Sequence, residues 1–243
     1  MTSPVLEVDG LSRRFGGLRA VDGLSFRLSA GDILGLLGPN GSGKTTALNL
    51  ISGVLRPNAG TIRLAGVDTT RESSFRLARR GIARTFQLVR VFRDMSVREN
   101  VMAGIAFAGP RLFGRAAVDR SDELLRQVGL EGRGSVSADR LNYIDQKKLE
   151  LARALASSPK VLLLDEWLAG LNPTELREAI ELVRRVRSSG VSIVMVEHVL
   201  EAVRALCSKC VVMNAGIPIA TGSPQEVLSH PEVVRAYIGG GHA

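Results

Sequence analysis

The stretch that decides the fold is Gly38-Pro39-Asn40-Gly41-Ser42-Gly43-Lys44-Thr45, which fits the pattern G-x-x-x-x-G-K-[S/T] at every fixed position. Residues 33–37 before it, ILGLL, form an apolar run that predicts a buried parallel strand. Residues 46–51 after it carry apolar side chains that can face a sheet, and Gly53 is placed to end this helix. A glycine-rich loop alone also occurs in tight turns, but here the strand, the lysine and the threonine all stand where a phosphate-binding loop needs them.

The chemistry of this loop predicts binding of a nucleoside triphosphate together with magnesium. Its glycines let backbone N–H groups surround a phosphate chain, and the following helix presents the positive end of its dipole. Lys44 adds a mobile positive charge, and the Thr45 hydroxyl is a magnesium ligand. We therefore predict that the loop and the start of the helix hold the nucleotide through Gly38, Pro39, Asn40, Gly41, Ser42, Gly43, Lys44, Thr45 and Thr46.

The composition limits the class of protein. A chain of 243 residues with 45% hydrophobic content can bury one large α/β core, or a core with a smaller subdomain. No stretch reaches about 18 consecutive apolar residues, which a membrane-spanning helix requires. The opening residues 1–4 lack the charged and apolar regions of a secretory signal. We therefore expect the chain to stay in the cytosol.

The formal net charge of +8 indicates a basic surface. Nucleic acid and an anionic membrane surface are both suitable partners for such a surface, and composition cannot choose between them. The arginines are spread through amphipathic segments such as residues 184–187, with few aromatic side chains nearby to stack on bases. This pattern is also typical of an ordinary solvated helix face.

The order of strand and helix patterns predicts an α/β fold. Alternating residues at 5–8, 25–28 and 61–64 predict short antiparallel strands around the phosphate loop. Between about residues 72 and 130 the pattern becomes helical and variable, with a break at Gly109-Pro110. This region is predicted to be an inserted helical subdomain.

Strand patterns return in the second half of the chain. The apolar runs at 161–164 and 191–196 flank a helix that begins at Asn172-Pro173. A strand, a helix and a strand at this spacing predict a parallel sheet. We thus expect a mostly parallel core sheet, an antiparallel β subdomain and a helical subdomain, followed by a loose glycine tail from Gly239.

Two acidic residues follow the most apolar strand of the sequence, at Asp165 and Glu166. Adjacent carboxylates at the end of a buried strand are costly unless a cation or a reaction uses them. In a protein with a phosphate loop, the first can hold magnesium and the second can orient the water that attacks the γ-phosphate. We predict Asp165 as a magnesium ligand and Glu166 as the catalytic base; an acidic pair at a helix N-terminus is the structural alternative.

Two further polar residues are weaker candidates. His198 directly follows the strand that ends at Val196-Glu197, where an imidazole can donate to the γ-phosphate, although a lone histidine is more often a structural residue. Gln87 carries an amide that can reach magnesium and the attacking water, although most glutamines are solvated. Neither residue identifies a site by itself.

The order of these features resembles the ATP-binding subunit of ABC transporters from end to end. The phosphate loop is followed by Gln87, by LELARAL at 149–155, by LLDE at 163–166 and finally by His198. Within that superfamily, four segments look like the branched-chain amino acid importer ATPases. They are RFGGL at 14–18, RTFQ at 84–87, AGLNP at 169–173 and PEVVRAY at 231–237.

The resemblance implies an ABC-type P-loop fold, with ATP and Mg²⁺ as cofactors. It implies that Phe15 stacks on adenine, that Gln87 is a hinge sensing magnesium, and that His198 is the switch residue on the γ-phosphate. The expected catalytic residues are Lys44, Gln87, Glu166 and His198, and the expected magnesium ligands are Thr45, Gln87 and Asp165. The nucleotide-binding core would cover about 1–86 and 155–243, and the helical subdomain about 87–154.

The resemblance also implies partners and a place of action. The helical region after Gln87 would dock on membrane permease subunits, and a periplasmic or extracellular binding protein would act indirectly. The chain would lie peripherally on the cytoplasmic face of the inner membrane, with no nucleic acid as partner. It would power uptake of branched-chain or other hydrophobic amino acids or related small solutes.

One motif departs from the family pattern. The signature LSGGQ reads Leu141, Asn142, Tyr143, Ile144 and Asp145 here. The second glycine of the signature lets a backbone N–H approach the γ-phosphate, so a β-branched side chain adds bulk at that contact. A carboxylate beside it is expected to repel a polyphosphate.

In this family each signature serves the ATP held by the opposite subunit, so the departure affects the partner's ATP. The hypothesis is that this chain works with a second ATPase subunit whose signature is intact, as a heterodimer. Two alternatives remain: a non-transport ABC protein acting on nucleic acid or ribosomes, and a nucleotide-sensing subunit that hydrolyses weakly. Trp167 stands where the family usually has proline after the Asp-Glu pair, and the sequence offers no mechanism for it.

Overall fold

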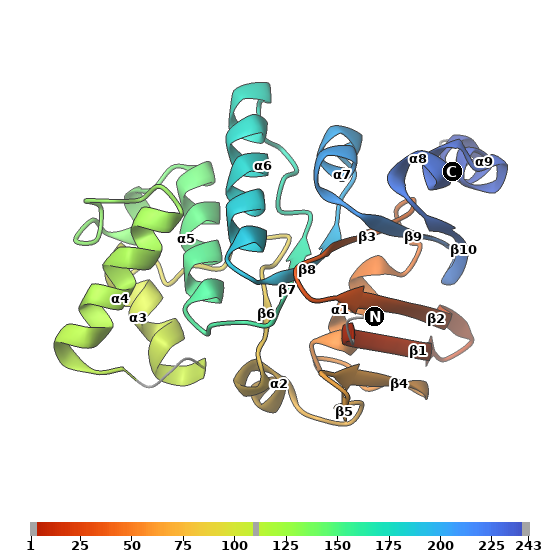
Figure 1. Cartoon of the computed structure of the whole chain (residues 1–243), viewed down its shortest axis with the longest axis horizontal. Coiled ribbons are helices and arrows are strands. Elements are labelled where there is room, and N and C mark those ends of the chain that lie inside the picture. The colour runs from red at the N-terminus through yellow and green to blue at the C-terminus, as the bar shows by residue number, and fades with distance from the viewer. Residues whose placement is uncertain (1–3, 109–111, 240–243) are drawn as a thin grey trace.

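The larger of two β-sheets forms the centre of the computed structural model, which describes residues 4–108 and 112–239 (Figure 1). Its six strands lie in the order β10-β9-β3-β8-β7-β6. All neighbours pair in parallel except β10 and β9, which are antiparallel. The bounds are β3 (Ile33–Leu37), β6 (Ile82–Arg84), β7 (Val161–Asp165), β8 (Ser192–Val196), β9 (Lys209–Asn214) and β10 (Ile217–Gly222). The predicted parallel core sheet is confirmed.

The smaller sheet is antiparallel throughout, with four strands in the order β2-β1-β4-β5. Its strands are β1 (Pro4–Phe15), β2 (Leu18–Ser29), β4 (Ala59–Leu64) and β5 (Val67–Asp68). The first two are longer than their alternating segments predict. Register shifts in the β1–β2 pair, one of them spanning Gly10 with φ 59°, let the pairing continue where the alternation of side chains breaks.

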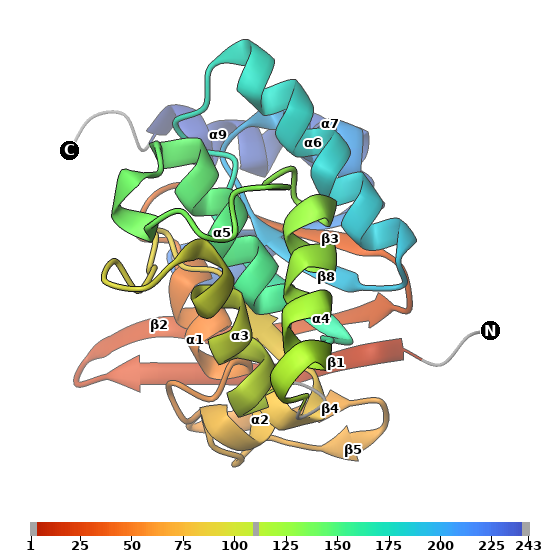
Figure 2. The same cartoon turned by 90° about the vertical axis from the view of Figure 1, so that its left-hand side faces the viewer.

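The helices fall into groups on either side of the parallel sheet. They are α1 (Lys44–Ile51), α2 (Ser74–Arg80), α3 (Val97–Ala108), α4 (Gly114–Gln127), the 3₁₀ turn η1 (Ala138–Arg140), α5 (Tyr143–Leu155), α6 (Pro173–Ser188), α7 (Leu200–Leu206), α8 (Pro224–Ser229) and α9 (Pro231–Gly239). Helices α3, α4 and α5 pack together at the end of the molecule farthest from α9 (Figures 1 and 2). No helix in the described part of the chain is long and apolar enough to cross a membrane.

Some sequence predictions need correction. The region 72–130 is not helical throughout, because β6 lies inside it and pairs with β7, its three residues being too few to show a strand pattern. The break at Gly109-Pro110 lies outside the described residues. Gly239 is the last residue of α9 rather than the start of a loose tail, while Gly240 and Gly241 are not described.

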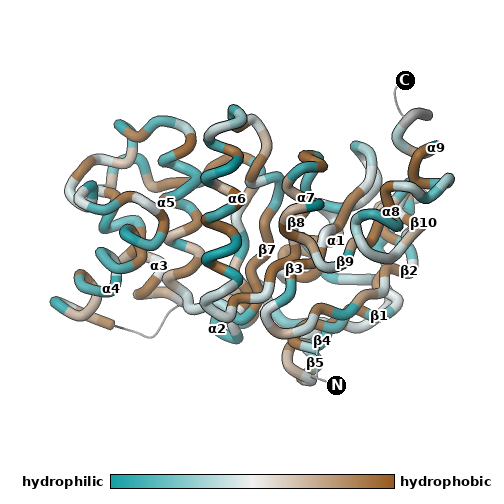
Figure 3. The backbone as a smooth tube through the Cα atoms, turned by 45° about the horizontal axis from the view of Figure 1, so that its top comes forward, coloured by the Kyte–Doolittle hydropathy of each residue, from teal (hydrophilic) through white to brown (hydrophobic). Residues whose placement is uncertain are grey.

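The central strand β3 is buried on both faces. Ile33 and Leu37 pack into a core shared with α5, α6 and α7, whereas Leu34 and Leu36 pack into a second core with α1 and the antiparallel sheet. Figure 3 shows the hydrophobic colour along β3, β7 and β8, while α6 alternates between hydrophilic and hydrophobic residues. Continuous apolar runs are typical of parallel strands covered on both faces. The polar residues that follow these strands therefore gather at one edge of the sheet.

The loop before α6 shows how local sequence fixes a helix start near that edge. The Asn172 side chain accepts hydrogen bonds from the N–H groups of Thr174 and Glu175, each at 3.0 Å. The Glu175 carboxylate accepts from the Asn172 N–H in return, and Pro173 occupies the first turn. This capping box ends the loop that follows the Asp-Glu pair. The predicted start of this helix is confirmed.

Candidate nucleotide site

The phosphate loop joins β3 to α1, as its sequence predicts, and its glycines are required by close packing. Gly38 has φ 142°, and a Cβ there would lie 2.0 Å from the Met213 carbonyl oxygen. Gly43 has φ 101°, and a Cβ there would lie 2.2 Å from the Ala20 carbonyl oxygen. Neither backbone oxygen can move aside without disturbing its strand. The loop conformation is thus fixed by neighbouring strands and not by its own sequence alone.

Lys44 points back into this loop. Its ammonium donates to the carbonyl oxygens of Gly38 and Pro39, both at 2.8 Å, and to the Ser42 hydroxyl at 3.4 Å. Burial lowers the pKa of Lys44, and the charges of Glu166 and Asp165 oppose this shift. The residue is only 5% exposed, so its charge is held where phosphate oxygens would approach the loop.

A pocket of about 850 Å³ opens beside the loop and brings together residues far apart in sequence. Phe15 and Leu18 from the antiparallel sheet line it together with Gln87, Glu166 and His198. The residues from Asn40 to Thr46 line its wall. Phe15 is 43% exposed, and the Arg13 guanidinium lies 4.8 Å from the centre of its ring. The pocket therefore combines an exposed aromatic ring, three polar side chains and the phosphate loop.

Glu166 is held between two other predicted residues. One of its carboxylate oxygens lies 2.6 Å from His198 Nε2, and the other accepts a hydrogen bond of 2.7 Å from the Gln87 amide. Its backbone has φ 51°, a left-handed conformation that is costly for a residue with a long side chain, and its N–H donates to the Val196 carbonyl. Strain of this kind persists where the surroundings fix the residue.

Asp165 is fully buried and paired with a residue to which sequence reasoning gave no role. Arg84 Nη2 donates to one oxygen of Asp165 at 2.8 Å, and Arg84 also contacts Asn49 and Ser52. The other oxygen, Asp165 Oδ1, is buried without a partner among the described residues. Arg84 ends β6, which pairs with β7, so the hidden strand β6 is why the sequence did not reveal this ion pair.

The donor set fits a magnesium ion that takes most of its ligands from phosphate and water. Asp165 Oδ1 is an unpartnered buried carboxylate oxygen, and the exposed Thr45 lines the same pocket as Gln87. Among the described residues, no group of three or more His, Cys, Asp or Glu side chains is arranged to hold a metal ion alone. Sites with few protein ligands are typical of magnesium bound with a nucleotide.

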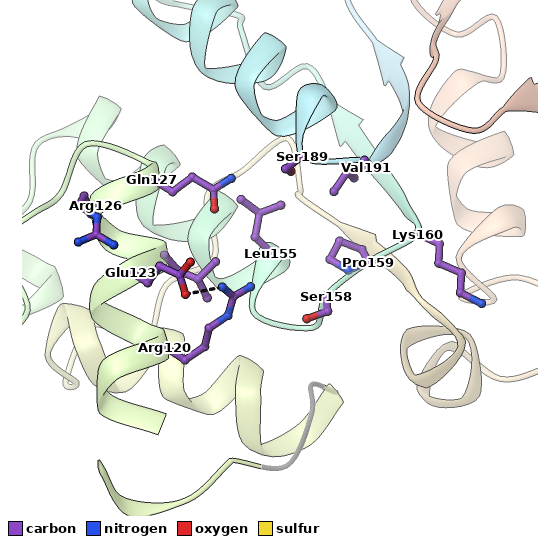
Figure 4. Close-up of a pocket in the computed structure, with 12 residues that line it drawn as sticks. Arg120, Glu123, Arg126, Gln127, Leu155, Ser158, Pro159, Lys160, Ser189 and Val191 are labelled. Carbon is purple, nitrogen blue, oxygen red and sulfur yellow. Dashed lines mark hydrogen bonds and ion pairs between the residues drawn. The ribbon is translucent and has the colours of Figure 1, made fainter. Parts of the chain in front are cut away.

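A second pocket, of about 600 Å³, lies at the opposite edge of the parallel sheet (Figure 4). It is bounded by α4, by the residues that precede β7 and by Gly190 and Val191, which precede β8. Ligands in α/β sheets bind outside the carboxyl ends of the strands, and this pocket lies at their amino ends. The Arg120 side chain at its rim is already paired with Glu123 (Figure 4). The first pocket is therefore the candidate site for the nucleotide.

The signature segment begins α5 and is held by its own side chains. The Asn142 side-chain oxygen accepts a hydrogen bond of 2.9 Å from the Asp145 N–H and caps the helix. The Asp145 carboxylate is paired with Arg133 and lies 3.8 Å from Lys148 Nζ. The predicted repulsion between Asp145 and a polyphosphate needs correction, because the residue is only 8% exposed and its charge is compensated by these cations.

Trp167, in the loop after Glu166, contacts Lys147 on α5, the helix that the signature segment begins. Its indole N–H donates to the Lys147 carbonyl at 3.3 Å, and the Lys147 ammonium donates to the carbonyls of Trp167 and Ala169 at 2.9 and 2.8 Å. Lys147 also lies 4.7 Å from the centre of the Tyr143 ring. Trp167 is 1% exposed. The residue thus ties the loop after Glu166 to the helix that carries the signature.

Two buried carboxyl groups near the site were also missed, because single glutamates in apolar segments carry no motif. Burial raises the pKa of Glu150 to about 7, although it accepts hydrogen bonds from the N–H groups of Phe86 and Arg90. Burial likewise raises the pKa of Glu197 to about 7, and its carboxylate accepts from the Leu168 N–H at 2.6 Å. Each links two segments of the site.

Comparison with known proteins agrees with this geometry. The ABC transporter family matches residues 21–169, and a family described as branched-chain amino acid ATP-binding cassette transporter matches residues 218–243. The high-affinity branched-chain amino acid transport ATP-binding protein LivG of Salmonella typhimurium is 40% identical over 98% of this chain and 99% of that protein. BraF of Pseudomonas aeruginosa, with the same description, is 37% identical over the same shares.

More distant relatives share the fold over nearly the whole chain. The lipopolysaccharide export system ATP-binding protein LptB of Escherichia coli is 32% identical over 96% of this chain and 97% of that protein. The solved structure of MJ1267, an ATP-binding cassette of an ABC transporter, superposes on 98% of this chain with a TM-score of 0.90 at 30% identity, and all of that chain is covered. The phosphate loop, the residues beside it and these matches lead to one conclusion: the chain belongs to the ABC transporter family of ATP-binding proteins.

Proposed function

We propose that this chain is the ATP-hydrolysing subunit of an importer for branched-chain or other hydrophobic amino acids. The observation that carries the ATPase is the position of Glu166, which lies between Gln87 and His198 in the pocket that Lys44 also lines. The likeness to LivG and BraF over nearly the whole chain supports the class of cargo, because both are described as branched-chain amino acid transport proteins.

The residues around the pocket have distinct roles in this proposal. The loop N–H groups and Lys44 bind the phosphates, and Phe15, which lines the same pocket, stacks on adenine. Thr45, Gln87 and Asp165 would hold Mg²⁺, which when bound neutralises charge on the β- and γ-phosphate oxygens. Asp165 is oriented for this by Arg84, which occupies one carboxylate oxygen and leaves the other facing no protein donor among the described residues.

Glu166 orients the attacking water in this proposal. Its carboxylate is 17% exposed, and its two oxygens contact His198 and Gln87, so a water that enters the pocket meets an acceptor of fixed direction. Gln87 lies beside both the proposed metal and the base, and His198 lies where it can contact the γ-phosphate. A base held by neighbours on both sides needs little reorganisation when the phosphates arrive.

The permease is proposed to dock where apolar side chains are exposed around a third, smaller groove. A groove of about 270 Å³ lies between β6, α3 and α5, lined by Phe86 and Gly104 among others. Phe75, Leu88 and Phe107 are between 59% and 81% exposed in the segments around it. We propose that residues 87–154 form a helical subdomain that joins the core at 1–86 and 155–243 across this groove, and that a cytoplasmic segment of the permease fills it. The chain would then work at the cytoplasmic face of the membrane, with a binding protein acting indirectly.

The second ATPase subunit is proposed to differ from this chain. Ile144 adds bulk where a γ-phosphate of the partner's ATP would approach, and Asp145, though paired, replaces a neutral side chain. A homodimer would place this altered signature over both ATP molecules. A companion subunit with an intact signature would complete the site at Lys44 and Glu166.

The test measures phosphate release and cargo uptake in proteoliposomes that hold the permease and the binding protein, with leucine as the cargo. We expect this chain together with its companion subunit to drive ATP-dependent leucine uptake, and Glu166→Gln to bind ATP while uptake stops. Full ATPase activity of the isolated chain would contradict the need for a companion. If Glu166→Gln changed nothing, the chain would be a nucleotide sensor rather than the motor.

A further inference from the structure

The C-terminal helix reaches the phosphate loop through one hydroxyl group. The N–H of Gly38 donates to the Tyr237 hydroxyl oxygen at 2.9 Å, across 199 positions of sequence. Gly38 is buried and follows the last residue of β3, whose pairing with β9 ends at Leu37 and Val212. A buried N–H that lacks a partner is costly, so the phenol satisfies a group that the sheet no longer pairs.

Gly38 also contacts Lys44, through the next peptide group of the loop. The Gly38 carbonyl accepts a hydrogen bond of 2.8 Å from the Lys44 ammonium, so Tyr237 and Lys44 bind the two polar groups of one residue. A side chain at this position would meet the Met213 carbonyl oxygen, so the close approach of the two backbones requires glycine here. A shift of this residue would therefore move both the lysine and the start of the phosphate cradle.

A second contact comes from the same part of the chain. The Gly216 N–H, in the turn between β9 and β10, donates to the Ser42 carbonyl at 3.1 Å. Strand β10 packs against α8 and α9, which carries Tyr237. Figure 1 shows these elements grouped beside β3 at the end of the molecule opposite α4. The segment 209–239 thus contacts the loop at two points, Gly38 and Ser42.

We propose that Tyr237 is a positioning residue for nucleotide binding, whose hydroxyl holds the backbone N–H of Gly38 and so helps to fix the Gly38 carbonyl that the Lys44 ammonium contacts. This inference rests on the proposed function, in which the loop binds ATP. The hydroxyl is suited to the task at neutral pH, because burial raises the pKa of Tyr237 and keeps the phenol neutral. The ring would still pack without the hydroxyl, so the two contributions can be separated.

The test compares the full chain with Tyr237→Phe, which removes only the hydroxyl, and with Val234→Ala, a control on an exposed position of the same helix. Binding of a fluorescent ATP analogue with magnesium gives Kd, and heating the nucleotide-free protein gives Tm. Because a neutral hydrogen bond accounts for a modest net free energy, we expect Kd to rise about three- to tenfold in Tyr237→Phe and to stay unchanged in Val234→Ala. In the assembled transporter, KM for ATP should rise by a similar factor with kcat within about twofold.

A direct measurement follows the Gly38 amide itself. Hydrogen exchange read by NMR should show this N–H protected in the wild-type chain without nucleotide. In Tyr237→Phe its exchange should accelerate, and by more than the exchange of the Gly216 N–H. A lower Tm with unchanged Kd would overturn the proposal, because the hydroxyl would then only anchor α9. Rapid exchange of Gly38 in the wild type would overturn it as well. Failure of the wild-type chain to bind the ATP analogue would instead contradict the proposed function.

Discussion

The phosphate loop and the signature segment are built by different means, although both take part in ATP binding in this family. The loop keeps every fixed residue of its pattern, and close contacts at Gly38 and Gly43 leave no room for change. The signature keeps only its leucine, yet Asn142 caps its helix and Asp145 is paired with Arg133. The phosphate loop is thus preserved, whereas the signature, which we propose faces another subunit, is altered and stabilised locally.

Removing the base is the most severe test of the preserved half. Glu166→Gln keeps the size of the side chain and can still bond to Gln87, but it cannot accept a proton from water. We expect phosphate release by the complete transporter to fall by about 10²- to 10⁴-fold, with ATP binding retained. Glu201→Gln, at an exposed position of α7, is the matched control and should leave the rate unchanged. A similar rate in both variants would break the comparison, since the preserved half would not then perform the chemistry.

The buried ion pair beside the loop should dominate the stability of this half. Arg84→Ala leaves the buried Asp165 carboxylate without its ion-pair partner, and both side chains are at most 6% exposed. We expect the free energy of unfolding, measured by chemical denaturation, to fall by about 3–5 kcal/mol. Arg80→Ala removes an exposed partner of Glu72 and should leave the free energy of unfolding nearly unchanged. Equal losses would show that burial of the pair has no special effect.

A pH titration tests the contact between the signature helix α5 and the segment that carries Gln87. Glu150 lies on α5 and accepts hydrogen bonds from Phe86 and Arg90, on either side of Gln87. Its pKa in the folded chain is about 7, above its ordinary value of 4.5. The group therefore stabilises the fold fully below about pH 4.5, and this contribution is lost as the pH rises through 7.

We expect Glu150→Gln to remove part of that loss. The unfolding free energy of the variant should decline less between pH 5 and 8 than that of the wild type, by about 1–3 kcal/mol. Glu197, whose folded pKa is also about 7, keeps its own contribution in both proteins. Chemical denaturation at several pH values measures the difference. Parallel curves for the two proteins would show that Glu150 does not titrate in this range.

Repairing the signature should give the smallest of these effects. The double variant Ile144→Gly with Asp145→Gln restores the family pattern at the two altered positions. We expect ATPase activity of the isolated chain to rise by about tenfold, because a donor near the γ-phosphate becomes accessible. Adding Glu166→Gln to this variant should abolish the gain, which is the control for contaminating activity. No gain at all would mean that the altered residues do not limit a homodimer.

The sequence predicted the fold and the loop well because their signals are local. A buried strand, a glycine loop and a capped helix are each encoded by neighbouring residues, as at Gly38 and Asn172. The roles proposed for Gln87 and His198 came from resemblance, since a single amide or imidazole carries no pattern. Their positions beside Glu166 agree with those roles, while the roles themselves remain predictions.

The contacts that sequence reasoning missed all join distant segments. Arg84 reaches Asp165 across a strand of three residues, and Lys147 and Trp167 bond through backbone groups that no side-chain pattern reveals. Arg133, twelve positions from Asp145, compensates a charge that the sequence alone predicts to repel a polyphosphate. Such contacts depend on tertiary packing, which determines the neighbours of a polar atom independently of its sequence context.

The position of β3 also has a consequence for the time at which the nucleotide loop forms during synthesis. Residue 33 pairs with Ile193 on one side, and Gly35 pairs with Cys210 on the other. The loop that follows β3 therefore leaves the ribosome long before either neighbouring strand exists. Parallel pairing between such distant segments is slow to form. A growing chain is thus expected to gain affinity for ATP only after about residue 214 has emerged, when the apolar strand β3 is at last covered on both edges.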